Sequence, residues 1–271
     1  MLDLSRVKTS GPMAFCLDQL VSGFGVAKPE HIAAPAKTAG SAYKKKKRAF
    51  TDAVRHRLGV TPKRIDEIPH AYTPEAHTQR PSLYLQGYWQ NERYFRDYAG
   101  VIRGDINLPM PNDSKALAAL ADHSITPVSL HVRRGDYVGN NVHPCCPPEY
   151  YGRAADYIAA RLKRRPVFLV FSDDLPWVQD NIRIDHETIH VNSAGTNRNY
   201  EDMALMATCQ AHIVANSSFS WWGAWLNPDP DKIVVAPDQW FGGMPTHTLD
   251  IVPEDWTILS GAGVSDPTTT A

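Results

Sequence analysis

The sequence of 271 residues has no apolar run that approaches the roughly 18 residues needed to span a membrane. Its first residues, 1–5, also lack the charged-then-apolar layout of a signal peptide. From these two absences we expect a cytoplasmic protein. One segment, the basic run Lys44, Lys45, Lys46, Lys47 and Arg48, could contact the inner face of a membrane peripherally, although a solvated helix face or loop is the favoured interpretation.

No excess of charge of one sign is present, because 28 Lys and Arg residues stand against 29 Asp and Glu residues. A formal net charge of −1 argues against a dedicated nucleic-acid-binding protein. The basic run 44–48 also lacks the interleaved aromatic side chains of a single-strand binding platform. We therefore expect no nucleic-acid partner.

Cysteine is scarce as well, since four residues cannot form the disulfide framework of a secreted protein of this length. Cys145 and Cys146 stand close to His143, but their spacing matches no usual zinc motif, so reduced thiols are expected. A P-loop and a G-x-G-x-x-G motif are both missing, which argues against ATPases and dinucleotide-dependent dehydrogenases. The D-x-D spacing at Asp229 and Asp231 lies among prolines and is interpreted as a turn rather than a magnesium site.

The chain does contain a regular alternation of strand and helix patterns in its second half. We expect strands over residues 127–132, 167–171, 189–191 and 212–215, a last strand over 233–236, and helices over 149–165, 200–210 and 220–226. Pro166 is expected to end the first of these helices. Such alternation predicts a parallel sheet covered on both faces, that is, a doubly wound α/β domain.

The first half is less regular. We expect a short strand over 82–85, and turn-forming residues gather over 108–113, after which Asp113 or Ser114 could cap an alanine-rich helix. We place the domain boundary so that residues 1–123 form one domain and residues 124–271 the other.

Three of the expected strands are followed by polar clusters, in residues 131–137 (HVRRGDY), 172–174 (SDD) and 216–222 (NSSFSWW). Ligands of open α/β sheets bind outside the carboxyl ends of the strands, so the clusters should converge on one pocket. Alone, each cluster has a plainer explanation: a surface Arg pair, a helix cap at Asp173 and Asp174, and tryptophans that pack into a core. The presence of all three clusters in this order, each after a strand, is a more specific sign of a ligand site than any single cluster.

The residue types in these clusters suit a nucleoside diphosphate. Arg133 and Arg134 can donate paired hydrogen bonds to phosphates. Ser217, Ser218 and the backbone N–H groups of a following helix would form an anion site, and Asp173 could accept from a ribose hydroxyl or a base. This set of residues requires no metal ion.

At these residues the sequence resembles the glycosyltransferase family 11 α-1,2-fucosyltransferases. The motifs 131–137, 171–174 and 216–227 (NSSFSWWGAWLN) carry the resemblance, and residues 86–90 (QGYWQ) with Tyr94 and Phe95 are similar to a segment that precedes them. The resemblance implies a GT-B-like architecture of two Rossmann-like domains, a GDP-β-L-fucose donor, a galactoside acceptor and inversion without a metal ion or other cofactor.

The resemblance also implies roles for individual residues. Arg133 would bind the pyrophosphate with support from Arg134, and Ser217, Ser218 and Phe219 would close over the phosphates. His131 and Asp173 would hold the guanosine end, and Asp174 belongs to the same donor site. One departure is the lack of the family's opening apolar strand and Gly-Gly-x-Gly-Asn-Gln loop, so we expect the first domain to be incomplete at its N-terminus.

Asp136 is the first candidate for the catalytic base that takes the acceptor proton, because it follows the Arg pair. An ion pair that positions Arg133 or Arg134 is an equally good interpretation of Asp136, and Glu201 and Asp202 are weaker candidates for the base. Two further functions remain open: an inactive remnant that binds a GDP-sugar or glycan, and a fucosyltransferase of α-1,6 or O-linked specificity.

Overall fold

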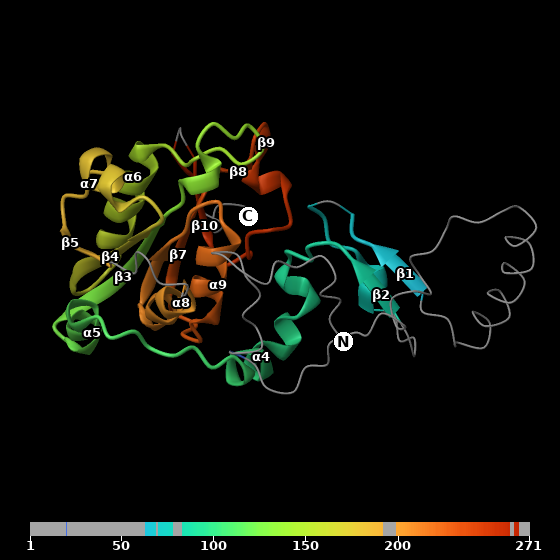
Figure 1. Ribbon diagram of the computed structural model, residues 1–271, viewed down its shortest axis with the longest axis horizontal. Coiled ribbons are helices and arrows are strands. Elements are labelled where there is room, and N and C mark those ends of the chain that lie inside the picture. Colours follow the sequence, from blue (N-terminus) through green and yellow to red (C-terminus); the bar gives the residue numbers. More distant parts are fainter. Residues whose placement is uncertain are drawn as a thin grey trace, which may run out of the picture. The chain divides into compact units, whose positions relative to one another are not determined.

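The computed structural model describes Leu20 and residues 63–68, 70–77, 83–191, 199–260 and 263–265, so the basic run 44–48 lies outside the described residues. The chain divides after Tyr98 into two compact units, residues 1–98 and 99–271. Figure 1 labels their elements in chain order. All three polar clusters fall in the second unit.

A seven-stranded sheet forms the centre of the second unit. Its strands lie in the order β11-β10-β7-β6-β3-β4-β5, and all neighbours are parallel except β10 and β11. The strands are β3 (Ile125–Val132), β4 (Arg165–Ser172), β5 (Glu187–His190), β6 (Ala211–Ile213), β7 (Ile233–Pro237), β10 (Thr257–Ser260) and β11 (Gly263–Ser265). Counted from β3, the parallel strands have the 3-2-1-4-5-6 order of a dinucleotide-binding fold.

Alternating residues of the central strands supply two separate hydrophobic cores. Val128 and Leu130 of β3 pack with residues of α6 and α7 on one face, whereas Val167 and Leu169 of β4 pack with residues of α5 and α8 on the other. Every residue of β3 is buried. The predicted doubly wound parallel sheet is therefore confirmed for this unit, because only a sheet covered on both faces buries whole strands.

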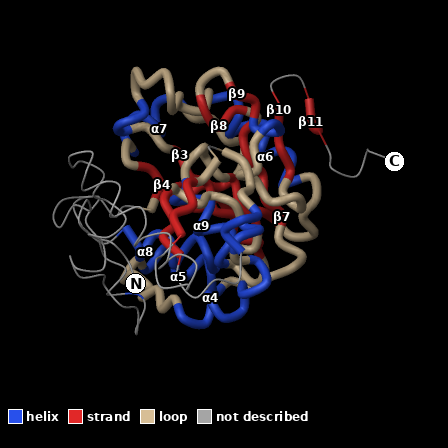
Figure 2. The backbone as a smooth tube through the Cα atoms, turned by 90° about the vertical axis from the view of Figure 1, so that its right-hand side faces the viewer, coloured by secondary structure: helices blue, strands red, loops and turns tan. Residues whose placement is uncertain are grey.

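Helices cover both faces of this sheet, as Figure 2 shows with α6 and α7 on one side and α5, α8 and α9 on the other. The helices of the second unit are α4 (Ala99–Asp105), α5 (Ser114–Ala121), α6 (Pro148–Ala159), α7 (Leu175–Asn181), α8 (Asn199–Thr208) and α9 (Ser218–Leu226). Asp113 caps α5 by accepting from the N–H groups of Lys115 and Ala116, which confirms one of the two predicted caps.

The predicted helix over 149–165 is too long in its C-terminal part, because α6 ends at Ala159. Arg165 already pairs with Ile125 as the first residue of β4. A residue before proline disfavours the helical conformation, so Arg165 must be extended and the helix has to end earlier. The strand over 233–236 is also not the last one, since β10 and β11 extend the sheet beyond β7.

The division after Tyr98 differs from the expected boundary between residues 123 and 124. α5 lies before that expected boundary, yet its Ala116 and Ala119 are buried in the core that also contains Leu169 and Leu205. The turn-forming residues over 108–113 therefore separate two helices of one unit. That residues 1–123 and 124–271 serve the acceptor and the donor stays a prediction.

The tryptophans of α9 belong to the core, as the sequence favoured. Trp221 and Trp225 are buried, Trp222 is half-buried, and the Trp221 indole donates to the carbonyl of Ile251 at 2.9 Å. After β7 the chain forms the small hairpin of β8 (Gln239–Phe241) and β9 (Met244–Pro245) and the 3₁₀ turn η5 (Thr246–Thr248).

In the first unit, two short strands pair in parallel. They are β1 (Lys63–Asp66) and β2 (Leu83–Gln86), which confirms the strand predicted over 82–85. The described residues of this unit also form 3₁₀ turns: η1 (Pro74–His77) lies between the two strands, and η2 (Glu92–Tyr94) and η3 (Arg96–Tyr98) follow β2. Tyr94 packs against Tyr72 and Trp89.

Candidate functional site

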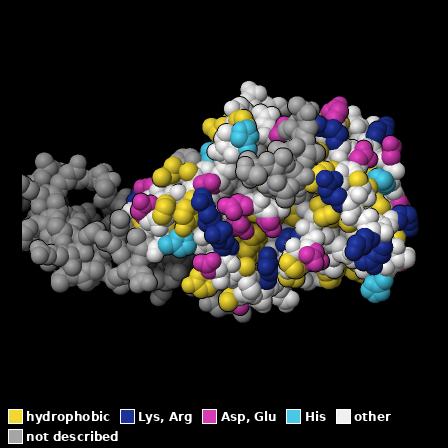
Figure 3. All heavy atoms as spheres, turned by 180° about the vertical axis from the view of Figure 1, so that it is seen from behind, with side chains coloured by type: hydrophobic (Ala, Val, Ile, Leu, Met, Phe, Trp, Pro, Cys, Tyr) yellow, Lys and Arg dark blue, Asp and Glu magenta, His cyan; other side chains and the backbone are white. Residues whose placement is uncertain are grey.

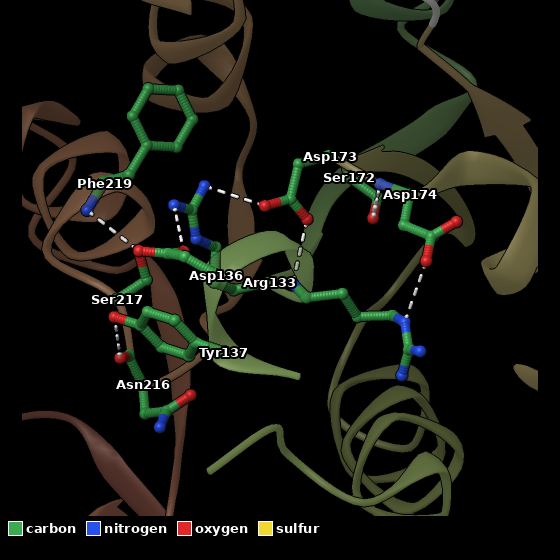
Figure 4. A network of polar contacts seen from close by, with 10 residues as sticks. Arg133, Asp136, Tyr137, Ser172, Asp173, Asp174, Asn216, Ser217 and Phe219 are labelled. Atoms are coloured by element: carbon green, nitrogen blue, oxygen red, sulfur yellow. Dashed lines mark hydrogen bonds and ion pairs between the residues drawn. The ribbon is translucent and has the colours of Figure 1, made fainter. Parts of the chain in front are cut away.

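The three polar clusters meet at the carboxyl ends of β3, β4 and β6. The strand order reverses between β3 and β6, which is where ligands bind in sheets of this kind. The backbone N–H of Arg134 donates to Asp173 at 2.8 Å, and the hydroxyl of Tyr137 donates to the carbonyl of Asn216 at 3.3 Å. The predicted convergence of the clusters is thus present in the structure (Figure 4).

Arg133 lies between two carboxylates (Figure 4). Its Nη2 is 2.7 Å from Oδ1 of Asp136, its Nη1 is 2.9 Å from Oδ2 of Asp173, and its Cζ lies 5.4 Å from the ring centre of Tyr137. Asp136 comes from the 3₁₀ turn η4 (Gly135–Tyr137) directly after β3. The ion pair that the sequence left open for Asp136 is present, and the role of Asp136 as a base stays a prediction.

Arg134 turns to a different set of partners. Its Nε donates to Oδ2 of Asp174 at 3.1 Å, and its Cζ lies 3.6 Å from the ring centre of Trp177. Asp174 also caps α7 by accepting from the N–H of Trp177 at 3.3 Å, so the helix cap expected for this cluster belongs to Asp174. The two neighbouring arginines therefore use separate carboxylates.

Gly135 allows Asp173 to approach the β3 loop. A Cβ atom at position 135 would lie 2.5 Å from Oδ2 of Asp173, the oxygen that pairs with Arg133. The same carboxylate accepts from the N–H of Arg134 through Oδ1. A larger residue at this exposed position would displace the Asp173 carboxylate, so glycine keeps these two contacts of Asp173 in place.

The amino end of α9 supplies the third side of the site. Ser217 is the N-cap, and its Oγ accepts from the N–H of Phe219 at 3.3 Å. Ser217 is buried, Ser218 is exposed and Phe219 is half-buried. Backbone N–H groups in the first turn of a helix and the positive end of its dipole favour an anion, so phosphate binding at this end of α9 stays a prediction.

His131, near the end of β3, is buried and uncharged. Its ring centre lies 5.4 Å from that of Phe219, and its Nδ1 has no hydrogen-bond partner among the described residues. Burial, with a smaller contribution from the charge of Arg133, lowers the pKa of His131 to about 3. The imidazole is therefore neutral at physiological pH.

Sequence reasoning gave no role to Tyr137, Asn216 and Trp177, which support the site. The buried Asn216 side chain donates to the carbonyls of Pro144 at 2.8 Å and Trp240 at 3.0 Å. It also accepts from the thiol of Cys146 at 3.4 Å. Tyr137 and Asn216 lie within the quoted motifs, whereas Trp177 could have been suspected only from its position three residues after Asp174.

The remaining candidates from the sequence have structural explanations. Cys145, Cys146 and Cys209 are free thiols, and burial raises the pKa of Cys146 to about 11. Asp229 accepts from the N–H of Asp231 at 2.9 Å, which confirms the predicted turn. Glu201 and Asp202 lie in the first turn of α8, where acidic side chains are favoured. In the described part of the chain, no three His, Cys, Asp or Glu side chains are grouped to hold a metal ion.

Charges of both signs are interspersed on the face of the molecule shown in Figure 3. This mixture agrees with the balanced composition. Across the residues that the structure describes, no helix combines the length and the apolar character needed to cross a bilayer.

Residues 69–259 match the family described as Glycosyl transferase family 11, and this range is more than half of the chain. The chain belongs to this family. The match includes all three polar clusters, so the resemblance expected from the motifs is confirmed.

Curated relatives in this family are glycosyltransferases. An alpha-1,2-colitosyltransferase of Escherichia coli is 37% identical over 66% of this chain and 63% of its own length. The O-antigen biosynthesis glycosyltransferase WbnK of Escherichia coli is 39% identical over 50% of this chain and 46% of its own length. A galactoside alpha-(1,2)-fucosyltransferase 2 of Pongo pygmaeus is 33% identical over 48% of this chain and 40% of its own length. The chain thus spans less than two thirds of the length of these relatives.

A solved structure of the NodZ alpha-1,6-fucosyltransferase soaked with GDP-fucose matches 77% of this chain and 73% of that chain. The TM-score is 0.33 and the identity is 15%, values too low to establish a common fold.

Proposed function

We propose that the protein transfers L-fucose from GDP-β-L-fucose to O2 of a terminal galactose, with inversion at the anomeric carbon and without a metal ion. Membership of family 11 and the α-1,2 linkage named in several relatives support this activity. In this proposal residues 99–271 bind the donor, and residues 1–98 contribute the acceptor side of a GT-B architecture.

The observation that carries the proposal is that the loop bearing Arg133 and Arg134 contacts the segment that leads into α9, where the strand order of the sheet reverses. Two guanidinium groups and the N–H groups of a helix end suit the two phosphates of GDP. His131, Asp173 and Asp174 would complete the donor site, with the neutral ring of His131 beside Phe219.

Charge builds on the leaving phosphate as the bond between the anomeric carbon and its oxygen breaks. Arg133, Ser217, Ser218 and the N–H groups of α9 would stabilise that charge more strongly in the transition state than in the ground state. The acceptor O2 forms the new bond from the opposite face, and GDP leaves with the electron pair. The sugar passes through an oxocarbenium-like state.

Asp136 would accept the proton from the acceptor hydroxyl in this scheme. Its carboxylate is now 2.7 Å from Arg133. A phosphate can accept two parallel hydrogen bonds from a guanidinium, so in this proposal donor binding replaces the ion pair between Arg133 and Asp136 and frees Asp136 to act as the base.

A second donor is favoured by one observation. The relative that is 37% identical over 187 residues is named an alpha-1,2-colitosyltransferase. GDP-colitose should therefore be tested beside GDP-fucose as the donor. Both GDP-sugars would bind at the same diphosphate site.

The test is GDP release from GDP-fucose with and without a galactoside acceptor. We expect acceptor-stimulated release from the wild type. In Arg133→Ala the rate of release should fall by about 100-fold or more, because the charge that develops on the leaving phosphate loses a hydrogen-bonding cation. Arg183→Ala is the control, since Arg183 is exposed and its side chain donates to backbone carbonyls at the end of α7. GDP binding without release by the wild type would instead support the inactive remnant. Turnover of Arg133→Ala within tenfold of the wild type would contradict the phosphate assignment.

A further inference from the structure

Trp177 presents its ring to the guanidinium of Arg134 at the edge of the candidate site. We propose that Trp177 is a positioning residue that holds Arg134 so that its two terminal nitrogens face the diphosphate of the donor. This inference rests on the proposed function, because it needs a nucleoside diphosphate as the ligand.

The guanidinium of Arg134 is held on its face and on one edge. The ring centre of Trp177 lies 3.6 Å from Cζ, and Asp174 accepts from Nε at 3.1 Å. The backbone N–H of the same residue is bonded to Asp173. Among the described residues, Asp174 is the one acceptor bonded to this guanidinium, so the edge formed by Nη1 and Nη2 is left for a ligand.

The two groups that hold Arg134 belong to one hydrogen-bonded junction between β4 and α7. Asp174 is the N-cap of α7 and accepts from the N–H of Trp177, which lies in the first turn of that helix. The N–H of Asp174 in turn donates to Oγ of Ser172 at 3.0 Å. A long side chain fixed in this way has lost its rotamer freedom before the ligand arrives, which favours binding.

An aromatic ring also holds a cation without cancelling its charge. Arg133 is paired with two carboxylates, Asp136 and Asp173. Arg134 is paired with one carboxylate and one ring, so it keeps more of its positive charge for an incoming phosphate. The two arginines are therefore unequal: ligand binding must displace partners from Arg133, whereas Arg134 is already in place.

The experiment compares the affinities of GDP and guanosine by calorimetry in the full chain. Trp177→Leu should weaken GDP binding by about threefold to thirtyfold, the range of a cation–π contact, and leave guanosine binding within twofold of the wild type. Trp177→Phe should restore most of the GDP affinity because it keeps an aromatic face. In an Arg134→Met background, Trp177→Leu should have no further effect on GDP binding.

The control is Tyr157→Leu. Arg161 lies 3.5 Å from the ring centre of Tyr157, so this variant removes a similar contact, and Tyr157 bonds Thr257 at the far end of the sheet. GDP binding should be unchanged in it.

Three results would overturn the inference. Equal weakening of GDP and guanosine by Trp177→Leu would indicate a general structural role. Unchanged GDP binding in Trp177→Leu would remove the role altogether, and a full additional loss in the Arg134→Met background would show that Trp177 does not act through Arg134. A folded wild type that binds no GDP would overturn the proposed function itself.

Discussion

Gly135 shows how closely residue type is constrained at the edge of the site. Asp173 bridges the side chain of Arg133 and the backbone of Arg134, and it can do so only because position 135 has no Cβ atom. The fixed position of this carboxylate sets the direction of the Arg133 guanidinium. An added methyl group would therefore act on the arginine through the aspartate.

Gly135→Ala is predicted to weaken GDP binding by about tenfold, because Asp173 helps to hold Arg133, and to lower the free energy of unfolding by less than about 1 kcal/mol, because position 135 is exposed. The Cβ atom would meet Oδ2 of Asp173 at 2.5 Å and displace it from Arg133. Calorimetric titration with GDP and urea unfolding measure the two effects. Gly104→Ala in α4 is the control, since no atom lies within 4 Å of its added Cβ and alanine favours a helix. Equal GDP affinities in both variants would contradict the prediction.

Two buried histidines are uncharged for the same main reason, which is burial. Burial lowers the pKa of His131 and of His212 to about 3, with a smaller effect of Arg133 on the first and of Lys232 on the second. His212 is bonded to Ser129 through Nδ1 at 2.8 Å and to Asn227 through Nε2 at 2.9 Å. Nδ2 of Asn227 is a donor, so Nε2 of His212 is the acceptor and Nδ1 carries the proton.

The stability of the protein is predicted to fall as the pH is lowered below 6.5. In this range the unfolded chain binds protons at these histidines, whereas the folded chain keeps both neutral until about pH 3. Between pH 7 and pH 5 the free energy of unfolding should drop by about 2 kcal/mol for each of the two. Urea unfolding at a series of pH values measures how the free energy of unfolding depends on pH. In His212→Gln this contribution of the two histidines to the pH dependence of stability should be about half as large. An unchanged slope of stability against pH in that variant would show that His212 is not one of the groups responsible.

At the scale of elements, the amino end of α9 is tied to the loop after β3 by Asn216. Its amide donates to the carbonyls of Pro144 and Trp240, and its backbone carbonyl accepts from Tyr137. One buried side chain thus fixes the loop over 138–147 beside the β7–β8 segment. The position of η4, with Asp136, depends on this link.

Asn216→Ala is predicted to lower the free energy of unfolding by about 3 kcal/mol. The buried carbonyl of Trp240 and the partly buried carbonyl of Pro144 would lose their donor, and an unsatisfied buried group costs about 1–3 kcal/mol. Urea unfolding provides the measurement. Asn181→Ala, which removes one exposed bond to the carbonyl of Trp177, should change stability by less than about 0.5 kcal/mol. Similar losses in the two variants would show that Asn216 is not the link described.

At the scale of the molecule, the second unit contains the whole parallel sheet, both cores and every residue of the proposed donor site. The first unit contributes β1, β2 and the 3₁₀ turns described above. Binding of GDP and transfer of the sugar should therefore be separable.

A fragment of residues 99–271 is predicted to fold and to bind GDP within about threefold of the full chain, because its core is complete by itself. It should not release GDP in response to a galactoside acceptor, since the acceptor side is proposed to lie in residues 1–98. Calorimetry and the GDP-release assay measure the two properties. A folded fragment without GDP affinity, or one with full acceptor-stimulated release, would contradict this division.

Much of the fold and the site could be predicted from sequence. The apolar strands 127–132 and 167–171 indicated a sheet buried on both faces, because only such strands need no polar side. The motifs after them placed Arg133, Asp173 and Ser217 at strand ends. Local patterns did not predict features that depend on contacts with distant residues. These are the early end of α6, the strand β10 beyond β7, and the packing of α5 into the second unit.

The sequence by itself determined which segments are strands and helices, which side chains follow the strands, and to which family the chain belongs, because periodicity and motifs are local properties. The tertiary structure alone decided which partners these side chains have. Asp173 pairs with Arg133 rather than standing free, Trp177 stacks on Arg134, and Gly135 makes room for a carboxylate 38 positions away. The physical reason is that parallel strands distant in sequence bring their carboxyl ends together, so contacts there depend on strand order and packing, which no local pattern encodes.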